Sequence, residues 1–311
     1  MDDETVPTRA MLLPNDGWDV RLHMFRAGEE VDTFALITQR YLVIIDTMTT
    51  PELATDIMQS LQRIRQGRHL IVINTHAHYD HCWGNAIFAD IEGRFAGPII
   101  GHAKTRALLL SQETKDYLAE RQANEPRLAH VKLAPPDLTF TDTMQIDGGD
   151  LTLELIPTPG HCDDHIAVWI PQIRLLLAGD AAEHPFPHVT RAEDLPILRT
   201  SLAKMQALDP LMVLPCHGGT KDPGLLARNL TYFDEAAQRC QQARAAGSVP
   251  DDWDTNAQLP DVIGFPYADA LQCVDADPGK TPKFYERFHR DALRVTLAAQ
   301  AGTTSSSIHP Q

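Results

Sequence analysis

Short apolar runs alternate with periodic apolar stretches along this chain, and the alternation predicts both strands and helices. Three runs near the start, at residues 19–25, 33–38 and 41–46, are separated by polar turn residues and indicate an antiparallel meander. A run rich in β-branched residues predicts a buried strand at residues 70–73, and further apolar runs predict strands at residues 98–101, 151–157, 166–170, 173–178 and 211–214.

Helices are expected between these strands. One helix is expected to begin after Thr50, which suits an N-cap, with Pro51 at the first helical position. Its apolar residues repeat along one face as far as Ile64, and Gly67 suits its C-terminal end. A capping box at residues 190–193 predicts a helix that runs to about residue 208. Further helices are expected at residues 83–91, 103–123, 223–246 and 284–299. Strands mixed with flanking helices throughout imply a layered α/β fold.

The strength of the periodicity divides the chain into three parts. Residues 1–17 are polar, and we expect a loose arm or an early edge strand there. Residues 18–247 hold the strand and helix alternation and are predicted to form one large domain. Residues 248–311 have weak periodicity and are predicted to be a C-terminal extension whose last ten residues, rich in Ser and Thr, are disordered.

Composition and charge narrow the classes of function. The 311 residues are 43% hydrophobic, which is enough to bury a full core, and the formal charge of −15 would repel nucleic acid. No apolar stretch is long enough to cross a bilayer, the acidic start is unlike a secretory signal, and five cysteines are too few for a disulfide framework. We therefore expect a cytoplasmic protein that acts on a small molecule, without a membrane or nucleic-acid partner. Its oligomeric state stays open, with a homodimer as one alternative.

The predicted strand at residues 70–73 leads into the densest group of metal-ligating side chains. His76, His78, Asp80 and His81 fall within six residues, on what we expect to be the loop at the C-terminal end of the strand. Imidazole and carboxylate groups suit zinc and similar divalent ions. The two histidines spaced two residues apart can converge on one ion, while Asp80 and His81 can face a second.

Three further candidate ligands come shortly after predicted strands, and each is next to a glycine. They are His161, Asp180 and His217. Glycine permits the sharp backbone turn that lets a ligand point into a crowded site. Because layered α/β folds place their chemistry at the ends of strands, we expect these three residues to belong to the same site as the first four.

The pattern His-x-His-x-Asp-His, followed by Gly-His, Gly-Asp and His-Gly, resembles that of the metallo-β-lactamase superfamily. The resemblance covers roughly residues 18–235. It implies a four-layer αβ/βα sandwich of the metallo-β-lactamase type, with two metals in a cleft at one edge. It also assigns roles to the seven residues: the first metal is held by His76, His78 and His161, the second by Asp80, His81 and His217, and Asp180 bridges them. Asp46 resembles an early structural aspartate of the family, although the glycine that usually follows it is missing here.

This resemblance implies a dinuclear zinc-dependent hydrolase, with iron or manganese as alternative metals. Zinc can lower the pKa of a bound water to about 7, so hydroxide is present at neutral pH. Asp80 and Asp180 could orient that hydroxide or move its proton. The expected substrate is a small-molecule ester, lactone, thioester or amide. The sequence contains no Gly-x-Ser-x-Gly, Walker or Gly-x-Gly-x-x-Gly motif that would indicate another centre.

Four residues near the motifs are candidates for contact with the substrate. His184 and His188 follow the bridging Asp180 in a loop that contains two prolines, and they could donate a proton to the leaving group or line the pocket mouth. The alternative is that both are surface histidines. Tyr79 and Trp83 flank the first motif and could form an apolar wall for the substrate, with core packing as the alternative for Trp83.

The substrate class is less constrained than the metal site. The sequence-similar true β-lactamases carry cysteine where this chain has Asp180, which argues against antibiotic hydrolysis as the main activity. Lactonases often have a tyrosine shortly after the bridging aspartate, and here the sequence is Ala-Ala-Glu-His. Thioesterases of the glyoxalase II type have a helical C-terminal part, as this chain does. A mononuclear iron oxygenase of the persulfide dioxygenase kind shares the fold and motif, and a non-catalytic metal-binding module is least favoured because all seven ligand positions are retained.

Overall fold

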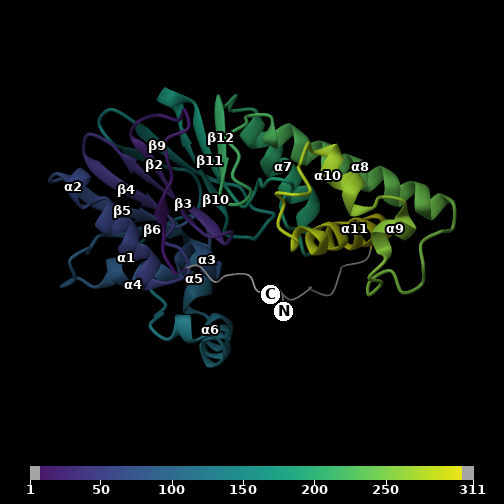
Figure 1. Ribbon diagram of the computed structural model, residues 1–311, viewed down its shortest axis with the longest axis horizontal. Coiled ribbons are helices and arrows are strands. Elements are labelled where there is room, and N and C mark those ends of the chain that lie inside the picture. The colour runs from purple at the N-terminus through teal and green to yellow at the C-terminus, as the bar shows by residue number, and fades with distance from the viewer. Residues whose placement is uncertain (1–7, 303–311) are drawn as a thin grey trace. The chain divides into compact units, whose positions relative to one another are not determined.

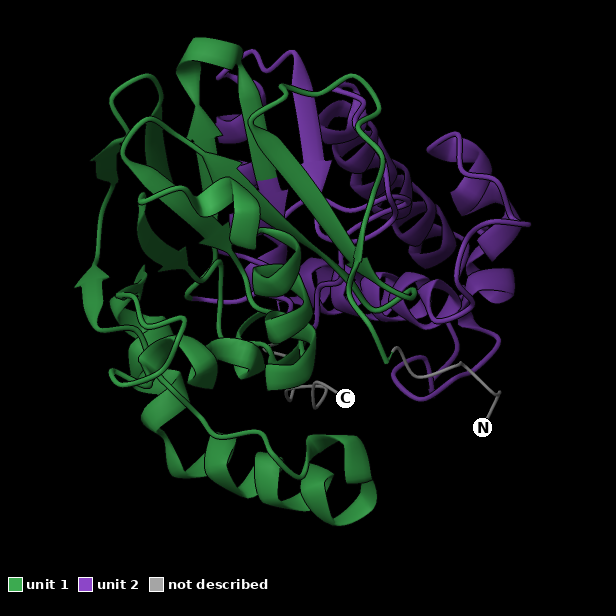
Figure 2. Cartoon of the chain, turned by 60° about the vertical axis from the view of Figure 1, so that its left-hand side comes forward, with its two compact units in different colours: residues 1–157, 164–177 green, residues 158–163, 178–311 purple. Residues whose placement is uncertain are grey.

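The computed structural model describes residues 8–302, which form two compact units (Figure 2). Unit 1 contains the described residues up to Pro157 together with residues 164–177, and unit 2 contains residues 158–163 and those from Ala178 onward. The first seven residues of the predicted arm and residues 303–311 of the predicted disordered tail lie outside the described residues. The domain boundaries predicted at residues 17 and 247 stay a prediction.

Unit 1 contains a seven-stranded sheet in which the strands follow their chain order (Figure 1). The first four strands are antiparallel neighbours, and the last four are parallel neighbours. The C-terminal ends of the parallel strands therefore meet at one edge of the sheet. The strands are β1 (Met11–Leu12), β2 (Leu22–Ala27), β3 (Val31–Ile37), β4 (Tyr41–Ile45), β5 (His69–Ile73), β6 (Ile99–His102) and β7 (Leu138–Phe140).

The part of the second sheet that belongs to unit 1 has antiparallel neighbours. Its strands in spatial order are the first residues of β11 (Leu175–Gly179), then β10 (Ile166–Ile170), β9 (Thr152–Pro157) and β8 (Met144–Asp147). β10 and β11 are fully buried, as their continuous apolar runs predict. β7 and β8 were not predicted, because these short strands are largely exposed and so lack a strong apolar signal.

The helices of unit 1 confirm the predicted cap and correct one predicted helix. Thr50 accepts a hydrogen bond from the Leu53 backbone N–H (3.3 Å), as expected of an N-cap. The single helix expected at residues 103–123 is two helices, because the Ser111 hydroxyl accepts from the Thr114 N–H and starts a new helix there. The helices and 3₁₀ turns are α1 (Pro51–Ser60), α2 (Gln62–Arg65), α3 (Tyr79–Cys82), η1 (Trp83–Asn85), α4 (Ala86–Ala89), α5 (Ala103–Leu110), α6 (Gln112–Asn124), η2 (Pro126–Leu128) and η3 (Pro171–Ile173).

Unit 2 is mainly helical. Its elements are the end of β11, then α7 (Asp194–Gln206), β12 (Met212–Pro215), α8 (Leu225–Ala245), α9 (Leu259–Ile263), α10 (Tyr267–Cys273) and α11 (Tyr285–Ala301). α8 packs against both α7 and α11 (Figure 1). Among residues 8–302, no helix combines the length and the apolar character needed to cross a membrane.

Two helices of unit 2 begin later than predicted. The capping box at residues 190–193 does not form, because the Arg191 guanidinium binds the Asp194 carboxylate (2.6 and 2.9 Å) and shapes a turn before α7. The Asp222 carboxylate accepts from the Gly224 N–H (2.8 Å), so residues 222–224 also form a turn before α8. α9 and α10 were not predicted because each is short and the chain between them contains glycine and proline.

A buried aromatic cluster joins α8 to α11 in unit 2, and His289 lies within it. The Phe186 ring stacks on Tyr232, with centroids 4.1 Å apart. The Tyr232 hydroxyl donates to His289 Nδ1 (2.9 Å), and His289 Nε2–H donates to the Phe265 carbonyl (2.8 Å). Both ring nitrogens are therefore used by the neutral imidazole. Burial lowers the pKa of His289 to about 4, from an ordinary value of 6.5.

This lowered pKa predicts a loss of stability in mild acid. Below pH 6.5 the unfolded chain takes up a proton on His289 while the folded chain does not, so the free energy of unfolding falls as the pH drops from about 6.5 towards 4. Between pH 7 and pH 5 the loss is about 2 kcal/mol. Urea unfolding in excess EDTA measures it, and the His289→Gln variant should lose about 2 kcal/mol less over this range. An equal pH dependence in the two proteins would contradict this assignment.

Candidate metal centre

Asp46, which directly follows β4, holds the first motif in place through buried hydrogen bonds. Its carboxylate is fully buried and accepts from the Thr75 backbone N–H (2.8 Å) and the Thr75 hydroxyl (2.7 Å). His81 Nδ1 lies 2.9 Å from the same carboxylate. These hydrogen bonds offset the cost of burying a charge, and they tie the end of β4 to the segment that follows β5.

The turn after Asp46 takes its shape without the glycine that is usual in the family. Asp46 and Met48 both have positive φ angles, 65° and 62°. The glycine that this region needs is instead Gly84, where an added Cβ would lie 2.1 Å from the Thr47 carbonyl oxygen. The Gly84 N–H also donates to the Met48 carbonyl (3.0 Å). A close approach of the backbone at residue 84 therefore holds the turn.

In unit 1 the structure brings together the residues of the first motif. The ring of His76 lies 4.5 Å from that of His78 and 4.1 Å from that of His81, measured between centroids. His81 Nε2 lies 3.5 Å from Asp80 Oδ2, and the Nδ1 atom on the other side of the ring faces Asp46. One expectation is corrected: Asp80 and His81 are not on the loop but in α3, since the helix begins at Tyr79.

Unit 2 contains the second group of predicted ligands, centred on Asp180. His217 Nε2 lies 3.3 Å and His161 Nε2 3.6 Å from Asp180 Oδ2. His161 Nδ1 lies 3.2 Å from the His188 carbonyl, to which it donates, so Nε2 carries the lone pair that faces Asp180. Gly160 has a φ of +126°, and an added Cβ there would lie 2.3 Å from the Leu198 nitrogen, so the predicted need for glycine beside this ligand is confirmed.

The donor atoms in each group have the chemistry and the spacing of metal ligands. A tetrahedral zinc site with bonds of about 2.0–2.1 Å places its ligand atoms about 3.3–3.4 Å apart. The observed separations are 3.5 Å in unit 1 and 3.3 and 3.6 Å in unit 2. His81 and His161 each present Nε2 while Nδ1 is held by an oxygen, which is the usual arrangement of a ligating histidine. The residues therefore fit a divalent ion of the zinc kind.

The two aromatic residues predicted to form a substrate wall pack in or against a hydrophobic cluster of unit 1. Trp83 is 1% exposed and packs in a cluster with Leu109, Leu118 and Leu128, which fits the core-packing alternative. Tyr79 is partly buried against this cluster, and the Arg121 guanidinium lies over its ring, 4.5 Å from the centroid. A role for either residue in substrate binding stays a prediction.

The two loop histidines of unit 2 differ in their surroundings. His188 stacks on Phe288 of α11, with centroids 3.9 Å apart, and its Nε2 lies 3.2 Å from Asp291 Oδ2. His184 is half-buried, and burial lowers the pKa of its imidazole. His188 is thus held by the C-terminal helix. The proposed role of His184 as a proton donor and that of His188 in lining the pocket stay predictions.

Glu183 was not among the site residues predicted from the sequence. This residue is 2% exposed, and its carboxylate belongs to a group of ligand atoms with His161 and Asp180 that all lie within 4.8 Å of one another. Burial raises the pKa of Glu183 to about 8, against the opposing effect of His217. The available signal was a carboxylate three residues after a predicted ligand, in the apolar context of two alanines.

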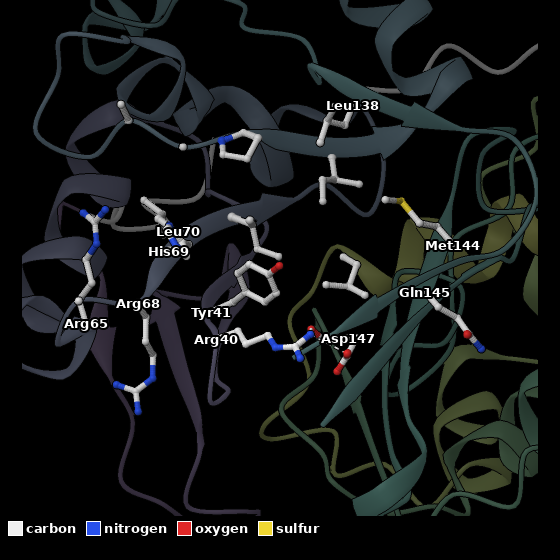
Figure 3. A pocket seen from close by; sticks show the side chains of 17 residues that line it. Arg40, Tyr41, Arg65, Arg68, His69, Leu70, Leu138, Met144, Gln145 and Asp147 are labelled. Carbon is white, nitrogen blue, oxygen red and sulfur yellow. Dashed lines mark hydrogen bonds and ion pairs between the residues drawn. The ribbon is translucent and has the colours of Figure 1, made fainter. Parts of the chain in front are cut away.

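A separate cavity of about 950 Å³ lies in unit 1 at the opposite end of β5 from the metal motif (Figure 3). Arg40, Arg68 and His69 contribute to its polar rim, and Leu70 is among its apolar lining residues. The Arg40 guanidinium pairs with the Asp147 carboxylate at 2.6 Å. Of the described residues that line this cavity, none is a predicted metal ligand.

Comparison with known proteins gives the following matches. A family model described as the metallo-beta-lactamase superfamily matches residues 28–217. The chain is 24% identical over 211 residues to the linear primary-alkylsulfatase of a Pseudomonas species, covering 57% of this chain and 39% of that protein. It is 39% identical over 77 residues to a beta-lactamase-like protein 2 homolog of Caenorhabditis elegans, which is 25% of each chain. The chain thus spans well under half the length of these two relatives.

A third relative is covered more fully, and solved structures support the fold. The chain is 26% identical over 212 residues to a metallo-beta-lactamase type 2 of a Bacillus species, covering 65% of this chain and 73% of that protein. A metallo-beta-lactamase family protein of Thermus thermophilus has a TM-score of 0.58 at 17% identity, covering 93% of this chain and 90% of the other. The DIM-1 metallo-beta-lactamase has a TM-score of 0.54 at 16% identity, covering 72% and 96%. These likenesses confirm the predicted fold class.

The contacts of Asp46 predict that it supports metal binding without being a ligand. The Asp46→Asn variant weakens the hold on His81 Nδ1, and we expect zinc affinity to fall about 10- to 100-fold, as for other outer-shell partners. Competition with a chromogenic chelator measures the affinity, and circular dichroism checks the fold. The matched control is Asp147→Asn, whose side chain is 66% exposed and should leave the affinity unchanged. Unchanged affinity in the Asp46 variant would contradict this role.

Proposed function

Because this chain belongs to the metallo-β-lactamase superfamily, we propose that it is a metal-dependent hydrolase with two divalent ions, zinc in the first instance. The observation that carries the proposal is that donor atoms in both ligand groups are spaced as around a metal ion. In this proposal the two groups share one dinuclear centre. By the family resemblance, the first ion would be held by His76, His78 and His161, the second by Asp80, His81 and His217, and Asp180 would contribute to both.

In this proposal, residues of the chain orient the histidine ligands and accept the proton of the attacking water. When bound, a divalent ion of the zinc kind lowers the pKa of water to about 7 and so supplies a nucleophile at neutral pH. Asp46 and the His188 carbonyl keep His81 and His161 in the tautomer that presents Nε2. As carboxylates beside the ions, Asp80 and Asp180 would orient the attacking water or accept its proton.

The proposed substrate is a small-molecule ester, lactone, thioester or amide. A formal charge of −15 disfavours a polyanionic polymer. Asp180 stands where the sequence-similar β-lactamases have cysteine, so an antibiotic is not the first choice, although one relative is a metallo-beta-lactamase. Another relative is a linear primary-alkylsulfatase, so an alkyl sulfate belongs in the test panel with lactones, thioesters and β-lactams.

Removal of the metal should abolish turnover. We expect the purified protein to contain two zinc ions per chain by elemental analysis, to lose hydrolytic activity after dialysis against a chelator, and to regain it with added zinc, because the metal supplies the nucleophile. Full activity in metal-free protein would contradict the proposal. A single iron per chain together with consumption of oxygen would support the persulfide dioxygenase alternative instead.

Loss of a single ligand should have a similar effect on turnover. We expect His78→Ala and Asp180→Ala each to lower kcat more than about 100-fold. This loss exceeds the effect of about 10- to 100-fold expected when a residue that only supports a ligand is changed. Circular dichroism should show that the fold is retained. His69→Ala is the control, since this exposed histidine at the start of β5 is not a predicted ligand. A ligand variant that retained a near-native rate would place the catalytic centre elsewhere.

A further inference from the structure

A buried carboxylate lies beside the predicted ligands of unit 2. Glu183 is 2% exposed, and ligand atoms of Glu183, His161 and Asp180 all lie within 4.8 Å of one another. Two carboxylates, Asp180 and Glu183, are thus buried close together. Like charges at this separation repel strongly in a medium of low dielectric, unless a cation or a proton is shared between them.

The backbone of Glu183 is fixed by a single residue of α8. The Asn229 side-chain oxygen accepts from the Glu183 N–H (3.2 Å), and its amide group donates to the carbonyl oxygens of Glu183 and Pro185 (both 2.9 Å). Asn229 is itself fully buried. These three hydrogen bonds fix the backbone of the segment, so the Glu183 carboxylate can move away from Asp180 only by rotation of its own side chain.

A residue of the C-terminal helix α11 orients the carboxylate of Glu183. The Tyr285 hydroxyl, in the first turn of α11, donates to Glu183 Oε2 at 2.7 Å, and Tyr285 is fully buried. The same helix holds His188 through Phe288 and Asp291, and the His188 carbonyl accepts from His161 Nδ1. α11 therefore supports both Glu183 and the segment that orients His161.

We propose that Glu183 is a further ligand of the ion held by His161 and Asp180, with Tyr285 as its positioning residue. This inference rests on the proposed function, since it requires a metal at the site. An ion that accepts Glu183 relieves the repulsion between the two buried carboxylates, because its positive charge faces both. The Glu183 carboxylate accepts from the Tyr285 hydroxyl and from the His188 backbone N–H, and its further acceptor positions can face the ion. The C-terminal extension thereby becomes part of the metal centre.

The test is a comparison of metal binding in four full-length proteins: wild type, Glu183→Gln, Tyr285→Phe and the control Glu193→Gln. Glu193 is an exposed carboxylate in the turn before α7. Zinc affinity is measured by chelator competition, and the visible absorption spectrum of the cobalt-loaded protein reports the ligands around the ion. We expect Glu183→Gln to weaken the binding of one ion at least about 100-fold and to change the cobalt spectrum. Tyr285→Phe, which loses only the positioning hydroxyl, should weaken it about 10-fold.

The outcomes separate this inference from the function it rests on. If Glu183→Gln and Tyr285→Phe both lower the melting temperature but keep the wild-type zinc affinity and cobalt spectrum, Glu183 is structural and the inference is overturned while the hydrolase proposal stands. If Glu183→Gln does not fold, Tyr285→Phe decides, and unchanged affinity in that variant overturns the inference. If the wild type binds no metal, the proposed function fails first.

Discussion

The buried carboxylate of Asp46 is the constraint on which the first ligand group depends. It accepts two hydrogen bonds from Thr75 and lies 2.9 Å from His81 Nδ1, so that β4, the end of β5 and α3 are fixed to one another. A carboxylate is stable in the interior only when its acceptor positions are used, and here its partners are Thr75, which precedes the predicted ligand His76, and His81, itself a predicted ligand. The same hydrogen bonds therefore both orient the predicted ligands and stabilise the fold.

The ligand group of unit 2 is also held by buried contacts, but these come from the C-terminal helix α11. This group surrounds Asp180, and its support comes from α11 through Tyr285 on Glu183 and through the residues that hold His188. The helix that the sequence marked only as a terminal element thus contributes to the surroundings of the predicted ligands. A C-terminal segment of this kind can alter the metal site without providing any of the seven residues of the motif.

The candidate ligands could be picked out from the sequence, whereas the residues that support them could not, for physical reasons. Each ligand comes shortly after an apolar strand or beside a glycine, and such local patterns can be recognised in a single chain. Strands β7 and β8 were missed because they are short and largely exposed. The contact between Glu183 and Tyr285 joins residues 102 positions apart, and no local pattern encodes it. The late start of α7 has a different, local cause, since the pairing of Arg191 with Asp194 three residues on competes with the capping box.

The central claim is that ligands from both groups bind one pair of ions. Anomalous diffraction at the zinc edge, from crystals of the zinc-loaded protein, tests it most directly. We expect two zinc peaks with Asp180 between them, and with ligands to each ion drawn from both groups. A single ion bound by one group alone, or no zinc peak at saturating zinc, would contradict this claim.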